Sequence, residues 1–334
     1  MSLAGIFSRR ESILAAILSL AILAACIANP ADFPRVSNLL EILRLATEAG
    51  IIVVGMTAVI LTAGIDLSVG SVLALCAVIL GKSWHGAGLP IAAAALVAVA
   101  AGAACGVLNG LLITRFGLPP LIITLATMAL YRGLALGLSR AEPVHGYPDG
   151  FLWLGQGTWK LGPVALPVQL PVLLVVVLLG GIVVGRTYWG RWLYAVGRNE
   201  VAAGLSGVPV RALKLAAYTA LGLLTGLASV VYVARVSTAK ADAGIMLELD
   251  VITACVLGGV SIFGGDGSVW GATLGLLIVA VARRGMDLAQ VPSAHQSIML
   301  GLLLILAVAL HSAWSQAMHR AALERAGALV SDGE

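Results

Sequence analysis

The side chains that could contact a solute are few, and most of them are uncharged. A small group of hydrogen-bonding residues lies within or between long apolar runs: Asp66, Ser68, Asn109, Thr124, Thr127 and Tyr131. Charges at membrane depth are costly, so polar groups there tend to face a cavity or a partner. Hydroxyls, an amide and one carboxylate suit a pathway for a neutral polyhydroxylated solute rather than for an inorganic ion.

Asp66 and Ser68 are also open to a purely structural interpretation. They lie in the Gly64–Gly70 stretch, which interrupts an apolar run, and Asp and Ser side chains accept hydrogen bonds from free N–H groups at a helix start. The sequence echoes this stretch once, because Asp66-Leu67-Ser68-Val69 recurs as Asp266-Gly267-Ser268-Val269. An internal repeat and shared capping chemistry explain the echo equally well.

Catalytic and nucleotide-binding patterns do not occur in the sequence. The five histidines form no H-E-x-x-H pair, and neither G-x-S-x-G nor G-x-x-x-x-G-K-[ST] is present. The four cysteines lie in apolar segments without a C-x-x-C pair, which is typical of buried small side chains. We therefore expect no enzyme, no cofactor and no metal, and any ATP that drives transport must be hydrolysed by another polypeptide.

The composition indicates a chain embedded in the lipid bilayer. Of 334 residues, 60% are hydrophobic and 11% charged, with a mean hydropathy of +1.02, whereas soluble domains are about 25% charged. Apolar runs near the ~20 residues that cross a bilayer recur along the chain. They predict an all-α membrane protein, a polytopic bundle of about ten transmembrane helices. The expected spans are 12–28, 45–64, 67–82, 89–113, 119–138, 167–185, 213–235, 248–263, 267–284 and 295–311.

The distribution of basic residues predicts the orientation. An even number of spans places both termini on one side, together with Arg9, Arg10 and the polar loop Arg186–Lys214. This loop carries Arg186, Arg191, Arg198, Arg211 and Lys214. The positive-inside rule assigns that side to the cytoplasm. The net charge of +4 is too modest to indicate a nucleic-acid partner.

Several short motifs follow one another across residues 45–310. They are Gly64–Ser71, Asn109-Gly110, Pro119-Pro120, Thr124–Met128, Gly190-Arg191, Ala195–Glu200, Ala202-Ala203, Leu205–Val208, Leu257–Gly265, Gly271 and Leu274-Gly275. In this order they resemble the permease subunits of bacterial ribose/xylose/galactose-type ABC importers. The resemblance implies a single transmembrane permease domain over residues 1–334, multi-pass in the bacterial inner membrane.

The resemblance also implies partners. They are a cytoplasmic ATP-binding cassette ATPase subunit, an extracytoplasmic solute-binding protein facing the Ser139–Leu166 loop, and a second permease, either identical or a paralogue. The 186–214 loop would contain the coupling helix that docks on the ATPase, near Glu200–Leu205 and ending at Gly207 and Pro209. The expected coupling residues are Arg198, Asn199, Glu200, Ala202, Ala203, Leu205, Ser206 and Gly207.

The cargo is left open by the sequence. Relatives of this kind carry rhamnose or another deoxyhexose, a pentose, or the autoinducer-2 signal, and we expect a monosaccharide-like solute. One alternative is an ABC permease for an amino acid or nucleoside. A proton-coupled secondary carrier is an alternative from a different class, although it typically needs a titratable carboxylate at mid-span, and here the carboxylates lie at span ends or at Asp66. An intramembrane enzyme is disfavoured by the missing catalytic patterns.

Overall fold

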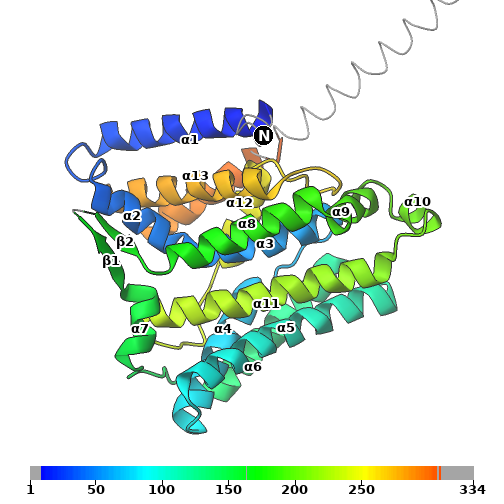
Figure 1. Cartoon of the computed structure of the whole chain (residues 1–334), viewed down its shortest axis with the longest axis horizontal. Coiled ribbons are helices and arrows are strands. Elements are labelled where there is room, and N and C mark those ends of the chain that lie inside the picture. The colour runs from blue at the N-terminus through cyan, green and yellow to red at the C-terminus, as the bar shows by residue number, and fades with distance from the viewer. Residues whose placement is uncertain (1–8, 163, 307, 310–334) are drawn as a thin grey trace, which may run out of the picture.

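The computed structural model describes residues 9–162, 164–306 and 308–309, which form a bundle of long helices (Figure 1). The first half contains α1 (Arg9–Ala28), α2 (Val36–Leu45), α3 (Thr47–Leu61), α4 (Val69–Gly81) with the π-helical turn η2 (Lys82–Gly86), α5 (Ile91–Phe116) and α6 (Pro120–Ser139). The second half contains α7 (Asp149–Gln156), β1 (Thr158–Leu161), β2 (Val164–Pro167), α8 (Leu170–Arg186), α9 (Tyr188–Arg198), α10 (Glu200–Leu205), α11 (Val210–Val236), α12 (Leu247–Leu257) and α13 (Val269–Leu288). A further helix, Ser293–Leu306, follows α13.

The centre of the bundle is formed by α3 and α4, whose side chains are buried along almost the whole of both helices. The long helices α5 and α11 lie side by side against them (Figure 1). A Cβ at Gly102 would touch the backbone of Gly222 and Gly226, so the two helix backbones approach as closely as glycine allows. Such approach at small residues is how helices associate without a hydrophobic driving force in lipid.

The predicted number of spans is not confirmed. Within the described residues, six helices are long and apolar enough to cross a membrane, and the number rises to eight if each of two bent pairs counts as one span. The pairs are α2 with α3, bent by 47°, and α8 with α9, bent by 67°. The all-helical prediction holds at this coarser level, with one short antiparallel hairpin, β1–β2, added in the described residues.

Two predicted spans differ from the structure. The run 248–263 is helical only as α12, whose 11 residues rise about 17 Å, against about 30 Å of hydrocarbon. Gly258 fits against the backbone of Gly271 and Ala272, and the chain turns there with φ +83° at Gly259. The predicted span 295–311 appears as the helix Ser293–Leu306, and its positions 307, 310 and 311 lie outside the described residues, as does the C-terminus.

Two glycine-containing junctions connect consecutive helices in the bundle. Residues 62–68 join α3 to α4, and residues 258–268 join α12 to α13. The junctions contact each other, because the Gly265 N–H donates to the Leu61 carbonyl at 3.0 Å. The two similar stretches, Asp66–Val69 and Asp266–Val269, thus lie at two neighbouring turns.

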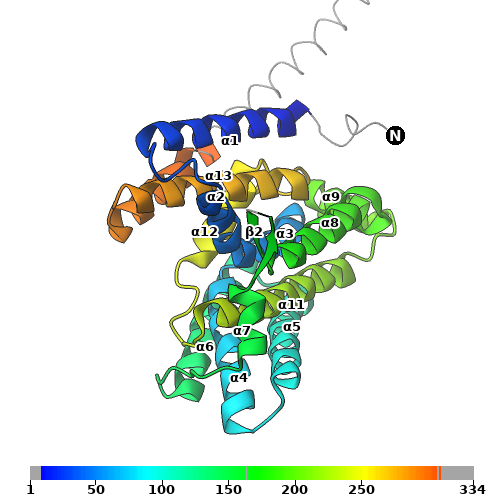
Figure 2. The same cartoon turned by 60° about the vertical axis from the view of Figure 1, so that its left-hand side comes forward.

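The remaining elements lie at the periphery. Helix α1 lies at one edge of the bundle, where it packs on α13 (Figure 2). Helix α7 and the hairpin lie at the end opposite α10 (Figure 1). In the hairpin, Thr158 pairs with Pro167 and Leu161 with Val164. This compact unit occupies the predicted loop between α6 and α8.

Candidate functional site

The short helix predicted in the polar loop is present as α10. Its first free N–H groups are capped by Asn199, whose Oδ1 accepts from the Ala202 N–H at 2.9 Å. The chain leaves α10 through Gly207, which has φ +86°, a conformation that glycine adopts without strain. Glu200 forms an ion pair of 2.6 Å with Lys214 and so ties the start of α10 to α11.

The outer surface of α10 is apolar. Val201 and Leu205 are 73% and 87% exposed, and they lie four residues apart on one face of the helix. Sequence reasoning missed Val201, although its spacing from Leu205 could have indicated it.

Seven of the eight predicted coupling residues are exposed: Arg198, Asn199, Glu200, Ala202, Leu205, Ser206 and Gly207. Ala203 is the exception, since it is only 5% exposed and faces the bundle. The Val208 N–H also donates to the Ala203 carbonyl at 3.1 Å, which closes the turn after α10. Ala203 therefore seats α10 on the protein instead of presenting a side chain to a partner.

Helix α9 joins α10 to both junctions. The Tyr194 hydroxyl donates to the Gly267 carbonyl at 2.8 Å, and the Arg198 Nε donates to the Gly265 carbonyl at 3.3 Å. Between them, Gly197 lies so close to the Leu61 carbonyl that a Cβ at this position would collide with backbone. These contacts hold α9 against the two junctions.

The predicted pathway residues gather into one buried hydrogen-bond network. Asp66 Oδ1 accepts from the Ser68 N–H at 2.8 Å and from the Ser68 hydroxyl at 2.6 Å. Asn109 Nδ2 donates to Asp66 Oδ2 at 3.2 Å and to Ser68 Oγ at 2.9 Å. The Tyr131 hydroxyl donates to Asn109 Oδ1 at 3.0 Å. The network thus connects the 62–68 junction to α5 and α6.

The two threonines extend this network only through the backbone. Thr124 donates to the Ile65 carbonyl at 3.3 Å, and Thr127 donates to the Thr124 carbonyl at 3.3 Å. All six predicted pathway residues are buried, and their hydrogen bonds go to one another or to the chain. In this conformation the network is closed to a solute.

The capping interpretation of the Gly64–Gly70 stretch is wrong in detail. Ser68 is the N-cap residue of α4, but no helix N–H donates to its side chain. Asp66 instead stabilises the turn before the helix by accepting from the Ser68 N–H. At the equivalent position Ser268 is a true cap, since its Oγ accepts from the Gly271 N–H at 2.9 Å.

Metal binding has no support in the described ranges 9–162, 164–306 and 308–309. Within them, no group of three or more His, Cys, Asp or Glu side chains is arranged to hold a metal ion. The four cysteines are free thiols, three of them buried.

A bundle of membrane-length helices, with a short exposed helix at one end, describes an integral membrane protein. Residues 38–308 match the family described as the branched-chain amino acid transport system permease component, and the chain belongs to this family. The matched range includes the buried network and α10.

Three relatives with reviewed functions illustrate the family. The ribose import permease protein of Escherichia coli is 37% identical over 303 residues, covering 90% of this chain and 92% of the relative. The autoinducer 2 import system permease protein of Photorhabdus luminescens is 37% identical over 306 residues, covering 89% and 90%. The fructose import permease protein of Rhizobium meliloti is 37% identical over 276 residues, covering 80% and 76%. No solved structure matches the chain.

Proposed function

We propose that this chain is the membrane-spanning permease subunit of an ATP-binding cassette importer for a monosaccharide-like solute. One observation carries the proposal: the chain is 37% identical, over 90% of its length, to a ribose import permease. Similar identity to permeases for fructose and for autoinducer 2 supports the same class of cargo. On this proposal the whole chain is one permease domain of the bacterial inner membrane.

The geometry of α10 supports coupling to a separate ATPase subunit. Val201 and Leu205 would enter an apolar groove on that subunit, while Asn199 and Gly207 fix the length and direction of the helix. ATP-driven movement of the groove would reach both junctions through α9. Because Asp66 and Ser68 belong to the first junction, the same movement would open the buried network toward the pathway.

The orientation follows from this assignment. The end that carries α10 and the start of α1 would face the cytoplasm, and α7 with the hairpin would face outward. A solute-binding protein would deliver cargo at the outward end. A second permease, identical or paralogous, would complete the pathway beside this one.

An amino acid as cargo is the second candidate, since the family's own description names branched-chain amino acid transport. The two cargoes are separated by a binding screen. The solute-binding protein that copurifies with this chain is titrated calorimetrically with D-ribose, D-fructose, L-rhamnose and L-leucine. Binding of a sugar without leucine supports the proposal, and the reverse result replaces the cargo.

Subunit association is tested separately. The tagged chain is extracted in mild detergent from its own cells, and its partners are identified by mass spectrometry. We expect an ATP-binding cassette subunit at a fixed ratio to the permease. A chain that purifies alone, yet transports when reconstituted, would point to a secondary carrier.

A further inference from the structure

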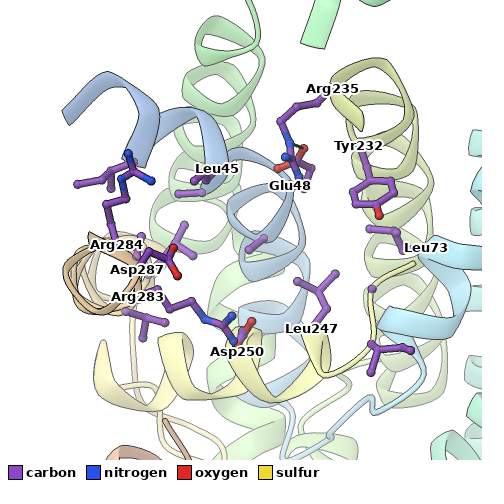
Figure 3. A pocket seen from close by; sticks show the side chains of 18 residues that line it. Leu45, Glu48, Leu73, Tyr232, Arg235, Leu247, Asp250, Arg283, Arg284 and Asp287 are labelled. Atoms are coloured by element: carbon purple, nitrogen blue, oxygen red, sulfur yellow. Dashed lines mark hydrogen bonds and ion pairs between the residues drawn. The ribbon is translucent and has the colours of Figure 1, made fainter. Parts of the chain in front are cut away.

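A second cluster of charged residues surrounds a cavity of about 300 Å³ at the end of the bundle opposite α10 (Figure 3). The start of α3, the ends of α11 and α13, and the start of α12 supply its walls. Small-molecule sites in proteins begin at roughly this volume. The cavity lies within a single chain, and none of the predicted pathway residues lines it.

Four of the charged side chains around the cavity form two ion pairs. Arg235 Nε donates to Glu48 Oε1 at 2.6 Å, and Arg283 forms an ion pair with Asp250. Arg284 and Asp287 also line the cavity. Three arginines and three carboxylates cancel formally, so the site does not select a net charge. An anion would meet the carboxylates, and a cation would meet the arginines.

One polar group at the cavity has no partner. Arg283 Nε is buried and makes no hydrogen bond, although the same guanidinium is paired with Asp250 through Nη2. A buried donor without an acceptor is unfavourable, and most such groups in proteins are satisfied. Nε is itself covered, so a ligand hydroxyl would bond to the partly exposed remainder of the Arg283 and Asp250 side chains.

The rest of the lining is apolar. Leu73, Leu247 and Leu276 contribute to the walls, and the Tyr232 ring stands beside Arg235, whose guanidinium carbon is 5.7 Å from the ring centre. In Figure 3 the two ion pairs lie on different sides of the space between the helices. A sugar ring has this same character, with hydroxyls at its edge that donate and accept, and C–H faces that pack on apolar side chains.

We propose that this cavity is a receiving site for a neutral, ring-shaped polyol on the outward side of the permease. The proposal rests on the proposed function, because the outward side is defined by placing α10 in the cytoplasm. It adds the residues that hold the cargo after release from a solute-binding protein: Glu48, Tyr232, Arg235, Asp250 and Arg283.

Site protection tests the proposal directly. Ala49 lines the cavity and is replaced by cysteine. The partly exposed Cys26 is replaced by alanine, so that Ala49→Cys carries the reactive thiol. The full chain in nanodiscs is labelled with N-ethylmaleimide, with D-ribose, D-fructose or L-leucine added. We expect saturable protection by at least one of the sugars and none by leucine.

The polar lining is tested with a charge-neutral double variant, Asp250→Asn with Arg283→Gln. Both partners are replaced because removal of one leaves an uncompensated buried charge. The matched control is Asp32→Asn with Arg35→Gln, an ion pair of 3.0 Å with both side chains more than half exposed. In the assembled transporter, the cavity variant should raise the KM of sugar uptake about tenfold or more, since hydrogen bonds to charged groups are lost. The control should leave KM unchanged.

The outcomes separate the two proposals. Sugar uptake that depends on the ATPase, without sugar protection of the Ala49→Cys thiol, overturns the receiving site and leaves the proposed function standing. Protection by leucine alone overturns the chemical class of the ligand. Uptake that needs no ATPase overturns the proposed function, whatever the labelling shows. If the double variant does not fold, Ala49→Phe fills part of the cavity without altering a charge, and unchanged uptake kinetics in it refute the site.

Discussion

Substitution of Gly197 by alanine is the sharpest perturbation of the connection between α10 and the bundle. A Cβ at this position would collide with the Leu61 carbonyl and the Gly265 N–H, and would lie 3.0 Å from the Gly264 carbonyl carbon. All three neighbours are backbone, which cannot rotate away as a side chain does. Helix α9 would have to retreat from both junctions by roughly an ångström, because the interior has no free volume to absorb a methyl group.

The cost can be worked from the contacts that α9 makes. Overpacking by one methyl group costs about 1–3 kcal/mol. The retreat also stretches the Tyr194–Gly267 and Arg198–Gly265 hydrogen bonds of 2.8 and 3.3 Å, each worth about 0.5–1.5 kcal/mol. A total of about 2–6 kcal/mol falls on one short helix, so we expect α9 to detach locally while the rest of the bundle stays folded.

The assay measures sugar uptake per ATP hydrolysed in proteoliposomes that contain the whole transporter. We expect Gly197→Ala to lower this ratio at least about tenfold, since 1.4 kcal/mol corresponds to a factor of ten. The matched control is Gly185→Ala near the end of α8, where a Cβ would meet nothing within 4 Å. An unchanged ratio in Gly197→Ala, with normal expression, would refute transmission through α9.

Three further substitutions test the site. Leu205→Asp should abolish capture of the ATPase subunit without lowering the melting temperature of the chain, because the Leu205 side chain is 87% exposed. If this variant still captures the ATPase subunit in a pull-down, α10 does not form the contact. Asp66→Asn should fold with a loss of about 1–2 kcal/mol, since the amide oxygen still accepts from Ser68. Asp66→Leu should lose more, because the buried Ser68 N–H and hydroxyl are left without this acceptor. Equal thermal stability of the two variants would contradict the network. Ser268→Ala should cost about 0.5–2 kcal/mol of stability through the lost cap of α13, and unfolding curves that superimpose on wild type would argue against it.

Local signals in the sequence were sufficient for some elements. The family resemblance, with Gly207 and Pro209 after the helix, predicted α10 at its observed bounds, because helix-ending residues act on near neighbours in the chain. Apolar length predicted the long spans α5 and α11 for the same reason. The polar network was also foreseen as a group of residues, although its closed hydrogen bonding was not.

Other features depend on contacts between distant segments. The apolar run 248–263 has the hydropathy of a span, yet the helix ends at Leu257, where Gly258 packs against Gly271. The Glu48–Arg235 ion pair joins residues 187 positions apart, and no pattern in the chain indicates it. Ala203 was placed on the coupling surface because a motif does not say which face of a short helix is buried.

The most direct test of an ATP-driven permease is uptake into proteoliposomes that hold this chain with its ATPase subunit and receive the sugar-loaded binding protein from outside. We predict that uptake requires ATP and an ATPase competent for hydrolysis, and that a protonophore leaves it unchanged. Uptake that continues without the ATPase and collapses with the protonophore would contradict coupling through α10 and assign the chain to proton-driven carriers.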